Sequence, residues 1–260
     1  MTQGLGYVGP GYLDAAARLV AGGKRLSYER MHVTPGATVL DVGCGPGTDT
    51  LPLAELVSAA GFVHGIDRDT EMVAEAERRA ADAGLAGRVE HRVGDAYALP
   101  WRDVTFDAVR CERLFLHLDR PEQATAEMVR VTKPGGRVVL MDTDWGTRSV
   151  DTPEVDLERR LSRVLAERCM ANGYSGRRLW GLMKAAAVRD LTVDLVPLHV
   201  DSYDFWRLLS RMELAFDEAV QAGAMTADEV RRLDESFREK DAAGTFFAST
   251  TVVLVAGTRV

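Results

Sequence analysis

The segment V-L-D-V-G-C-G-P-G at residues 39–47 places a glycine-rich turn directly after an apolar strand pattern that begins at Ala37. Glycine at alternate positions of such a turn lets the backbone bend sharply and lets a ligand approach it closely. A helical pattern follows over residues 48–59. The order strand, glycine turn and helix therefore predicts the first βα unit of an α/β fold, with a ligand site at the turn.

Strand and helix patterns continue to alternate after this unit, which favours parallel βαβ units. Further strands are predicted at residues 62–66, 88–93, 106–111 and 137–141, and helices at 70–83 and from about residue 119 to the K-P-G-G segment at 133–136. Residues 137–141 are nearly all apolar, as is typical of a central parallel strand. The first half of the chain thus predicts a mostly parallel sheet.

The second half of the chain contains more helical pattern than a simple α/β sheet requires. Helices are predicted at residues 151–174 and 177–188, and strands at 191–200 and 249–256. Between these two strands, residues 205–220 form one apolar helix face, and Thr226 and Glu229 have the spacing of a capping box. The insert is either additional core or a cover over a site, and its content of Met, Phe and Trp favours the cover.

Asp67 stands at the end of the second predicted strand, 20 residues after Gly47. A carboxylate at this point can accept hydrogen bonds from both ribose hydroxyls of a nucleoside. NAD would need a further glycine for its pyrophosphate, where this chain has Thr48 followed by Asp49. Asp49 would repel a pyrophosphate, whereas Asp41 and Asp49 suit a cationic ligand such as S-adenosylmethionine.

From about Thr38 to Trp145 the chain resembles the core of the class I S-adenosylmethionine-dependent methyltransferases, in the group similar to ubiquinone/menaquinone-biosynthesis enzymes. The matching blocks are V-L-D-V-G-C-G-P-G, G-I-D-R-D-T-E-M-V from Gly65, G-D-A-Y-A-L-P-W from Gly94, F-D-A-V-R-C-E-R-L-F-L-H-L from Phe106 and V-R-V-T-K-P-G-G-R-V-V-L from Val129. The resemblance implies a Rossmann-like α/β fold with a seven-stranded, mostly parallel sheet. Its last strand, residues 249–256, would be antiparallel, and helical lid insertions would be added.

The resemblance also implies a set of residues that bind S-adenosylmethionine, which leaves as S-adenosylhomocysteine. The glycines would line its methionine portion, Asp67 would bind the ribose, and the residues after the second and third strands would surround the adenine. Relatives often carry Asp or Asn at the end of the fourth strand, where this chain has Cys111 and Glu112. The implied cofactor-binding residues are Asp41, Gly43, Gly45, Gly47, Asp67, Arg68, Met72, Asp95, Ala96, Cys111, Glu112 and, in an N-terminal segment with Tyr7 and Arg18, Tyr12.

Transfer of a methyl group from a sulfonium is an in-line displacement, which depends on alignment and on exclusion of water. A general base helps only where the acceptor must lose a proton. His117, in the L-H-L segment after the fourth strand, is the candidate base, and His199 is a second candidate. His32, His64 and His91 are interpreted as structural or surface residues.

The net charge of −7 and the mixing of basic with acidic residues argue against a nucleic-acid partner. The first ten residues do not resemble a secretory signal, and no apolar run reaches the length of a membrane span. Three widely spaced cysteines indicate a reducing compartment and no metal cluster. A cytoplasmic protein is therefore expected.

These features predict one domain over residues 1–260, with an N-terminal helical cap at 1–36 and a cofactor-binding core at 37–145. Residues 151–174 and 203–244 would form a helical substrate lid. The expected activity is methyl transfer to an O, N or C atom of a small organic molecule, with secondary metabolites among the candidates. Two alternatives stay open: a non-methylating reaction such as cyclisation on the same fold, and methylation of RNA or protein.

Overall fold

The computed structural model describes residues 19–260, so Tyr7, Tyr12 and Arg18 lie outside the described residues. The chain forms two compact units. The first contains the described residues up to Cys111 together with Ala126–Val139 and Thr258–Val260, and the second contains Glu112–Thr125 and Leu140–Gly257. A single domain over the whole chain stays a prediction, and the two units are described separately below.

The strands of residues 19–260 form a seven-stranded sheet in the order β3-β2-β1-β4-β5-β7-β6. The fold is the predicted Rossmann-like arrangement, mostly parallel with an antiparallel last strand. In the first unit, β1 pairs in parallel with β2 on one side and with β4 on the other, and β2 pairs in parallel with β3. The strands are β1 (Thr38–Val42), β2 (Phe62–Asp67), β3 (Val89–Val93), β4 (Phe106–Glu112), β5 (Thr132–Val150), β6 (Arg189–Val200) and β7 (Ala248–Thr258).

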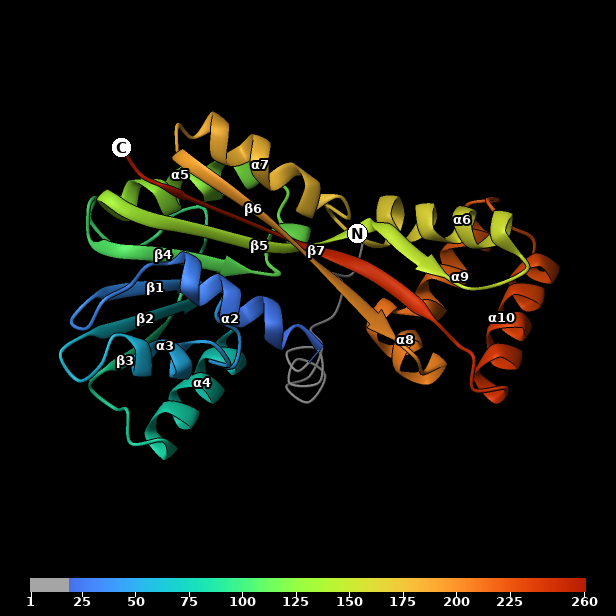
Figure 1. Ribbon diagram of the computed structural model, residues 1–260, viewed down its shortest axis with the longest axis horizontal. Coiled ribbons are helices and arrows are strands. Elements are labelled where there is room, and N and C mark those ends of the chain that lie inside the picture. The colour runs from blue at the N-terminus through green and yellow to red at the C-terminus, as the bar shows by residue number, and fades with distance from the viewer. Residues whose placement is uncertain (1–18) are drawn as a thin grey trace. The chain divides into compact units, whose positions relative to one another are not determined.

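Helices of the first unit lie beside its strands, with α3 (Thr50–Leu56) along β2 and α4 (Thr70–Asp82) along β2 and β3 (Figure 1). Asp69 caps α4, because its side chain accepts hydrogen bonds from the backbone N–H groups of Glu71 and Met72. The unit also contains α2 (Ala21–Arg30), which lies within the predicted N-terminal cap. Helix α5 (Pro121–Val131) begins in the second unit and ends in the first.

The second unit is richer in helix, and α6, α8, α9 and α10 pack against one another within it (Figure 1). The predicted capping box is confirmed, since Thr226 and Glu229 exchange side-chain to backbone hydrogen bonds at the start of α10. Tyr203, Phe237 and Phe246 form an aromatic cluster with ring centroids 5.4–6.2 Å apart. The helical elements are η1 (Phe115–His117), α6 (Val155–Val164), a π-helical turn η2 (Leu165–Cys169), α7 (Ser175–Ala185), α8 (Tyr203–Ser210), α9 (Met212–Gln221) and α10 (Ala227–Ala242).

Several predicted boundaries are wrong. The helix predicted over residues 48–59 is only Thr50–Leu56, and that over 151–174 ends at Val164 and continues as the π-helical turn. The apolar face over 205–220 is divided between α8 and α9, because Arg211 adopts a left-handed conformation with φ of 51° that no helix can contain.

The strand predicted at residues 137–141 extends over Thr132–Val150. Asp142, Asp144 and Trp145 come directly after the predicted strand, but in the structure they lie within β5. The physical reason is the neighbouring strand β7, which offers a long partner for the backbone groups of β5. Hydrogen bonding between the strands carries β5 beyond its apolar segment.

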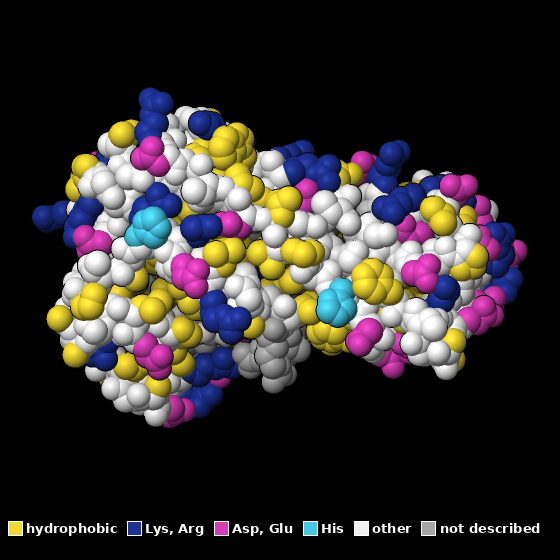
Figure 2. Space-filling model, in the orientation of Figure 1, with side chains coloured by type: hydrophobic (Ala, Val, Ile, Leu, Met, Phe, Trp, Pro, Cys, Tyr) yellow, Lys and Arg dark blue, Asp and Glu magenta, His cyan; other side chains and the backbone are white. Residues whose placement is uncertain are grey.

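On the face of the molecule drawn in Figure 2, Lys and Arg side chains are interspersed with Asp and Glu side chains. Exposed ion pairs of the described residues include Arg160 with Glu229 at 2.6 Å and Arg232 with Glu154 at 2.6 Å. None of the helices in the described part of the chain combines the length and the apolar content that a membrane crossing requires.

Candidate functional site

The glycine turn after β1 adopts left-handed backbone conformations, with φ of 75° at Gly43, 51° at Gly45 and 76° at Gly47. The backbone N–H groups of Gly43 and Cys44 both donate to the carbonyl of Ile66 in β2, at 2.8 and 3.1 Å. Gly47 is packed so closely that a Cβ atom would lie 3.0 Å from Cβ of Ala76 in α4. The turn is therefore held against β2 and α4 in a conformation that other residues rarely adopt.

Asp67, the last residue of β2, fastens this turn. One oxygen of its carboxylate accepts the N–H of Gly45 at 2.9 Å, and the other accepts the N–H of Asp69 at 3.0 Å. The sequence pattern predicted a ligand-binding carboxylate here, but not its bond to the turn. That bond depends on which N–H group the folded turn presents to β2, and no sequence motif encodes it.

The parallel registers bring the other predicted residues of the first unit to one edge of the sheet. Val42 is aligned with Ile66 of β2 and with Cys111 of β4, and Asp67 is aligned with Val93 of β3. The glycine turn, Asp67 and Asp95 thus follow the carboxyl ends of adjacent strands. Asp95 and Arg68 are exposed, Ala96 is half-buried, and Met72 and Cys111 are buried.

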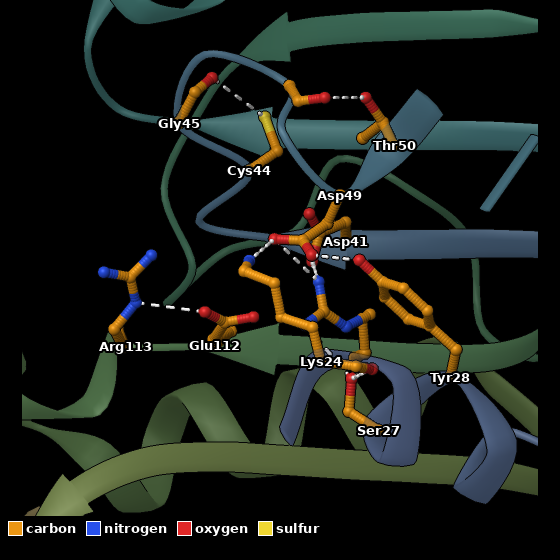
Figure 3. A network of polar contacts seen from close by, with 12 residues as sticks. Lys24, Ser27, Tyr28, Asp41, Cys44, Gly45, Asp49, Thr50, Glu112 and Arg113 are labelled. Atoms are coloured by element: carbon orange, nitrogen blue, oxygen red, sulfur yellow. Dashed lines mark hydrogen bonds and ion pairs between the residues drawn. The ribbon is translucent and has the colours of Figure 1, made fainter. Parts of the chain in front are cut away.

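A buried network of charges lies beside the glycine turn (Figure 3). Asp49 forms an ion pair with Nζ of Lys24 at 2.6 Å and with Nη1 of Arg110 at 3.3 Å. The same Nη1 lies 3.0 Å from Oδ1 of Asp41. The hydroxyl of Tyr28 donates to Asp49. Two cations and two anions are therefore buried together.

The network controls the ionisation of its members. Burial alone would raise the pKa of Asp49, but Arg110 and Lys24 outweigh it and hold that pKa below its usual value. Burial, together with Asp49, raises the pKa of Tyr28 well above its usual value, so its hydroxyl stays protonated. Asp49 is therefore charged at neutral pH.

This network corrects one step of the sequence interpretation. Asp41 and Asp49 were expected to present negative charge to a cationic ligand, whereas Lys24 and Arg110 balance both charges. The preference for a cationic ligand therefore does not follow from these two residues. The sequence did contain one sign of this network. Arg110 stands inside the apolar strand predicted at 106–111, and a buried arginine requires an acidic partner. The sequence pattern did not indicate which acidic residue that partner would be.

In the second unit, His117 is exposed at the end of the turn η1, and Glu112 is buried and bonded to Arg113 at 3.0 Å. Asp142 fastens η1, because its carboxylate accepts the N–H of Leu116 at 2.9 Å as well as that of Thr143 at 2.7 Å. Burial raises the pKa of Asp142 to about 7.

The helical insert has its own core in the second unit. Trp206, Leu209 and Met212 are buried, whereas Phe205 and Phe216 are half-buried. Arg148 of β5 lies in this core, where its guanidinium bonds Ser162 at 2.7 Å and lies over the ring of Trp206. Three of these five apolar residues are thus buried in the core of the second unit.

Three comparisons place the chain among known proteins. A family model described as a methyltransferase domain matches residues 39–136. An uncharacterised 37.1 kDa protein in transposon Tn4556 of Streptomyces fradiae is 34% identical over 247 residues, which cover 94% of this chain and 69% of that protein. The demethylmenaquinone methyltransferase of Lactiplantibacillus plantarum is 36% identical over 120 residues, 46% of this chain and 51% of that enzyme, so this chain spans about half its length.

Among solved structures, the YcgJ protein of Bacillus subtilis is similar with a TM-score of 0.65 and 19% identity. The match covers 92% of this chain and 98% of YcgJ. At this identity the similarity concerns the fold alone, which agrees with the strand order described above.

Proposed function

Because the chain belongs to the class I S-adenosylmethionine-dependent methyltransferases, we propose that it transfers the methyl group to an O, N or C atom of a small organic molecule. Secondary metabolites are among the candidates. The observation that carries this proposal is the glycine turn, held by Asp67 at the carboxyl edge of the parallel strands. The name of the Lactiplantibacillus relative, which denotes a small quinone-type acceptor, supports an acceptor of this class.

The residues at this edge fit the cofactor. Gly43 and Gly45 are half-buried, Gly47 is buried, and none of the three carries a side chain that would separate the left-handed turn from a ligand. We assign these glycines to the methionine portion. We assign the ribose to Asp67, and the adenine to Arg68, Met72, Asp95 and Ala96. Asp41 accepts a hydrogen bond from Arg110 and contributes to cofactor binding by holding that arginine in place. When bound, S-adenosylmethionine supplies an activated methyl group on a sulfonium.

The proposed ribose role predicts that Asp67→Ala binds S-adenosylhomocysteine more weakly by about 1.5–3 kcal/mol, since it loses charge-assisted hydrogen bonds to the ligand and the bond to Gly45. Calorimetric titration would measure this change. Asp107→Ala is a matched control, because the Asp107 carboxylate also accepts a backbone N–H, that of Thr38 at 2.9 Å, but at the opposite ends of the strands. Equal affinities in the two variants would contradict the assignment.

For His117 we expect that replacement by alanine preserves measurable turnover. The side chain is exposed, and alignment of the reactants supplies most of the rate in this chemistry. The assay is mass spectrometry of methylated product and of S-adenosylhomocysteine, with a panel of small acceptors. Complete loss of turnover with cofactor affinity intact would instead identify His117 as an essential base.

The same assay tests the proposed reaction against its alternatives. Methylated small molecules accompanied by stoichiometric S-adenosylhomocysteine support the proposal. Conversion of a substrate without S-adenosylhomocysteine would favour a non-methylating reaction, and methylation of RNA or protein only would favour a macromolecular acceptor. We further propose that the half-buried Phe205 and Phe216 contact the acceptor, while Trp206, Leu209 and Met212 form the core of the lid.

A further inference from the structure

Three polar side chains, Thr50, His91 and Glu77, contact one another next to the glycine turn. They are not among the residues proposed to contact the ligand. The hydroxyl of Thr50, in the first turn of α3, lies 3.1 Å from the carbonyl oxygen of Gly47 and 2.8 Å from Nε2 of His91 in β3. Nδ1 of His91 lies 2.9 Å from a carboxylate oxygen of Glu77 in α4. A chain of polar contacts therefore runs from Glu77 through His91 and Thr50 to one carbonyl of the turn.

The three contacts cannot all be hydrogen bonds while His91 is neutral. The carbonyl of Gly47 only accepts, so Thr50 must use its one hydroxyl proton to bond it, and Nε2 of His91 must then donate to Thr50. Nδ1 faces a carboxylate oxygen and must donate as well. Both ring nitrogens carry a proton only in the imidazolium form. In the neutral form, Nδ1 donates to Glu77, Nε2 accepts the proton of Thr50, and Gly47 loses this donor.

We propose that Thr50 and His91 are positioning residues for the cofactor, and that the protonation state of His91 decides whether Thr50 holds the carbonyl of Gly47. This inference rests on the proposed function, in which the glycine turn binds the cofactor. Neither residue touches the ligand in this scheme. They act by holding the backbone of the turn in place through the carbonyl of Gly47.

Because the ring of His91 is tightly packed, the hydroxyl of Thr50 is the group that can rotate when the charge of His91 changes. The side chain of His91 is fully buried. A Cβ atom on Gly65 would lie 2.6 Å from Cδ2 of the His91 ring, and one on Gly47 would lie 3.2 Å from its Nε2. The ring is therefore confined between β2 and the glycine turn, and a change in its charge is answered by rotation of the Thr50 hydroxyl.

The charges around His91 set the direction of the response. Burial lowers its pKa below the usual 6.5, although Glu77 from α4 and Glu90 from β3 oppose this shift. From the turn, Cys44 contributes a thiol whose pKa is raised by burial and which stays neutral, and α3 contributes the uncharged Thr50. His91 is thus neutral at pH 7.5 and becomes charged as the pH falls through its lowered pKa. If the held form of Gly47 binds the cofactor better, affinity increases as the pH falls through the pKa of His91.

The test is calorimetric titration of the full chain with S-adenosylhomocysteine at pH 5.5 and 7.5. We expect the wild-type protein to bind S-adenosylhomocysteine at least about threefold more tightly at pH 5.5 than at pH 7.5. This difference corresponds to part of the free energy of one hydrogen bond. Thr50→Val preserves the shape of the side chain but removes its hydroxyl, so it should bind about tenfold more weakly at pH 5.5 and lose the pH response. Thr50→Ser restores the hydroxyl and should keep both the affinity and the response.

Thr132→Val is the matched control, because Thr132 is also fully buried in the first unit and donates to a backbone carbonyl, that of Met128 at 2.7 Å. It should behave as the wild type. Wild-type affinity in Thr50→Val, a pH response that persists in it, or equal losses in Thr50→Val and Thr50→Ser would each overturn the inference. Absence of binding by the wild-type protein would count against the proposed function instead.

Discussion

Gly47→Ala is expected to destabilise the protein by about 3 kcal/mol and to weaken binding of S-adenosylhomocysteine by roughly a hundredfold or more. Two effects add. A φ of 76° costs a residue with a Cβ atom about 1–2 kcal/mol. The new Cβ would also lie 3.0 Å from Cβ and 3.2 Å from Cα of Ala76, and the backbone of α4 cannot move away without disturbing its packing on β3.

Gly84→Ala separates these two effects. Gly84 has a similar φ of 70°, and a Cβ atom there would meet no other atom within 4 Å. It should therefore show only the backbone cost of about 1–2 kcal/mol and normal ligand affinity. Urea unfolding and calorimetric titration of both variants measure the difference. If Gly47→Ala is no worse than Gly84→Ala in both measurements, the turn is not packed as described.

Arg110→Met is expected to destabilise the protein by about 3–5 kcal/mol, the cost of removing one partner from a buried ionic network. The guanidinium of Arg110 is fully buried and lies 3.0 Å from Asp41 and 3.3 Å from Asp49. Methionine fills much of the same space, but it leaves Lys24 as the remaining cation beside the two carboxylates of the network, Asp41 and Asp49. Urea unfolding at pH 7.5 measures the loss.

The loss should also depend on pH. Because Asp49 has a lowered pKa in the folded wild type, its contribution is complete above the unfolded value of 3.8 and disappears as the pH falls through the folded pKa. Without Arg110 the pKa of Asp49 rises, and its protonation relieves the unpaired charge. The difference between wild type and Arg110→Met should therefore shrink as the pH is lowered towards 4.

Arg78→Met provides the comparison for this variant. Arg78 also pairs with two carboxylates, Glu75 at 2.8 Å and Asp82 at 2.5 Å, but its side chain is 60% exposed. An exposed pair of this kind is screened by water and contributes little to stability. A loss in Arg110→Met no larger than that in Arg78→Met would show that the buried network does not stabilise the fold.

Local patterns sufficed for much of this fold. The glycine turn between β1 and α3, the apolar strands, the helix α4 and the capping box at Thr226 each depend on residues within one element or its immediate neighbours. Such features are encoded by periodicity and by the backbone preferences of glycine and of capping side chains. The motif blocks from Val39 to Leu140 added the number of strands and the antiparallel last strand, because together they resemble one known family.

The contacts that hold the candidate site depend instead on which strands become neighbours. Lys24 and Asp49 are 25 residues apart, Asp41 and Arg110 are 69 apart, and Thr50 and His91 are 41 apart. Arg110 reaches Asp41 because β4 pairs directly with β1, and no local pattern reports that pairing. The sequence alone therefore determined the class of fold and the position of the turn. Only the tertiary structure decided how its charges are balanced and what supports it from behind, since these interactions form between segments that meet when the sheet is assembled.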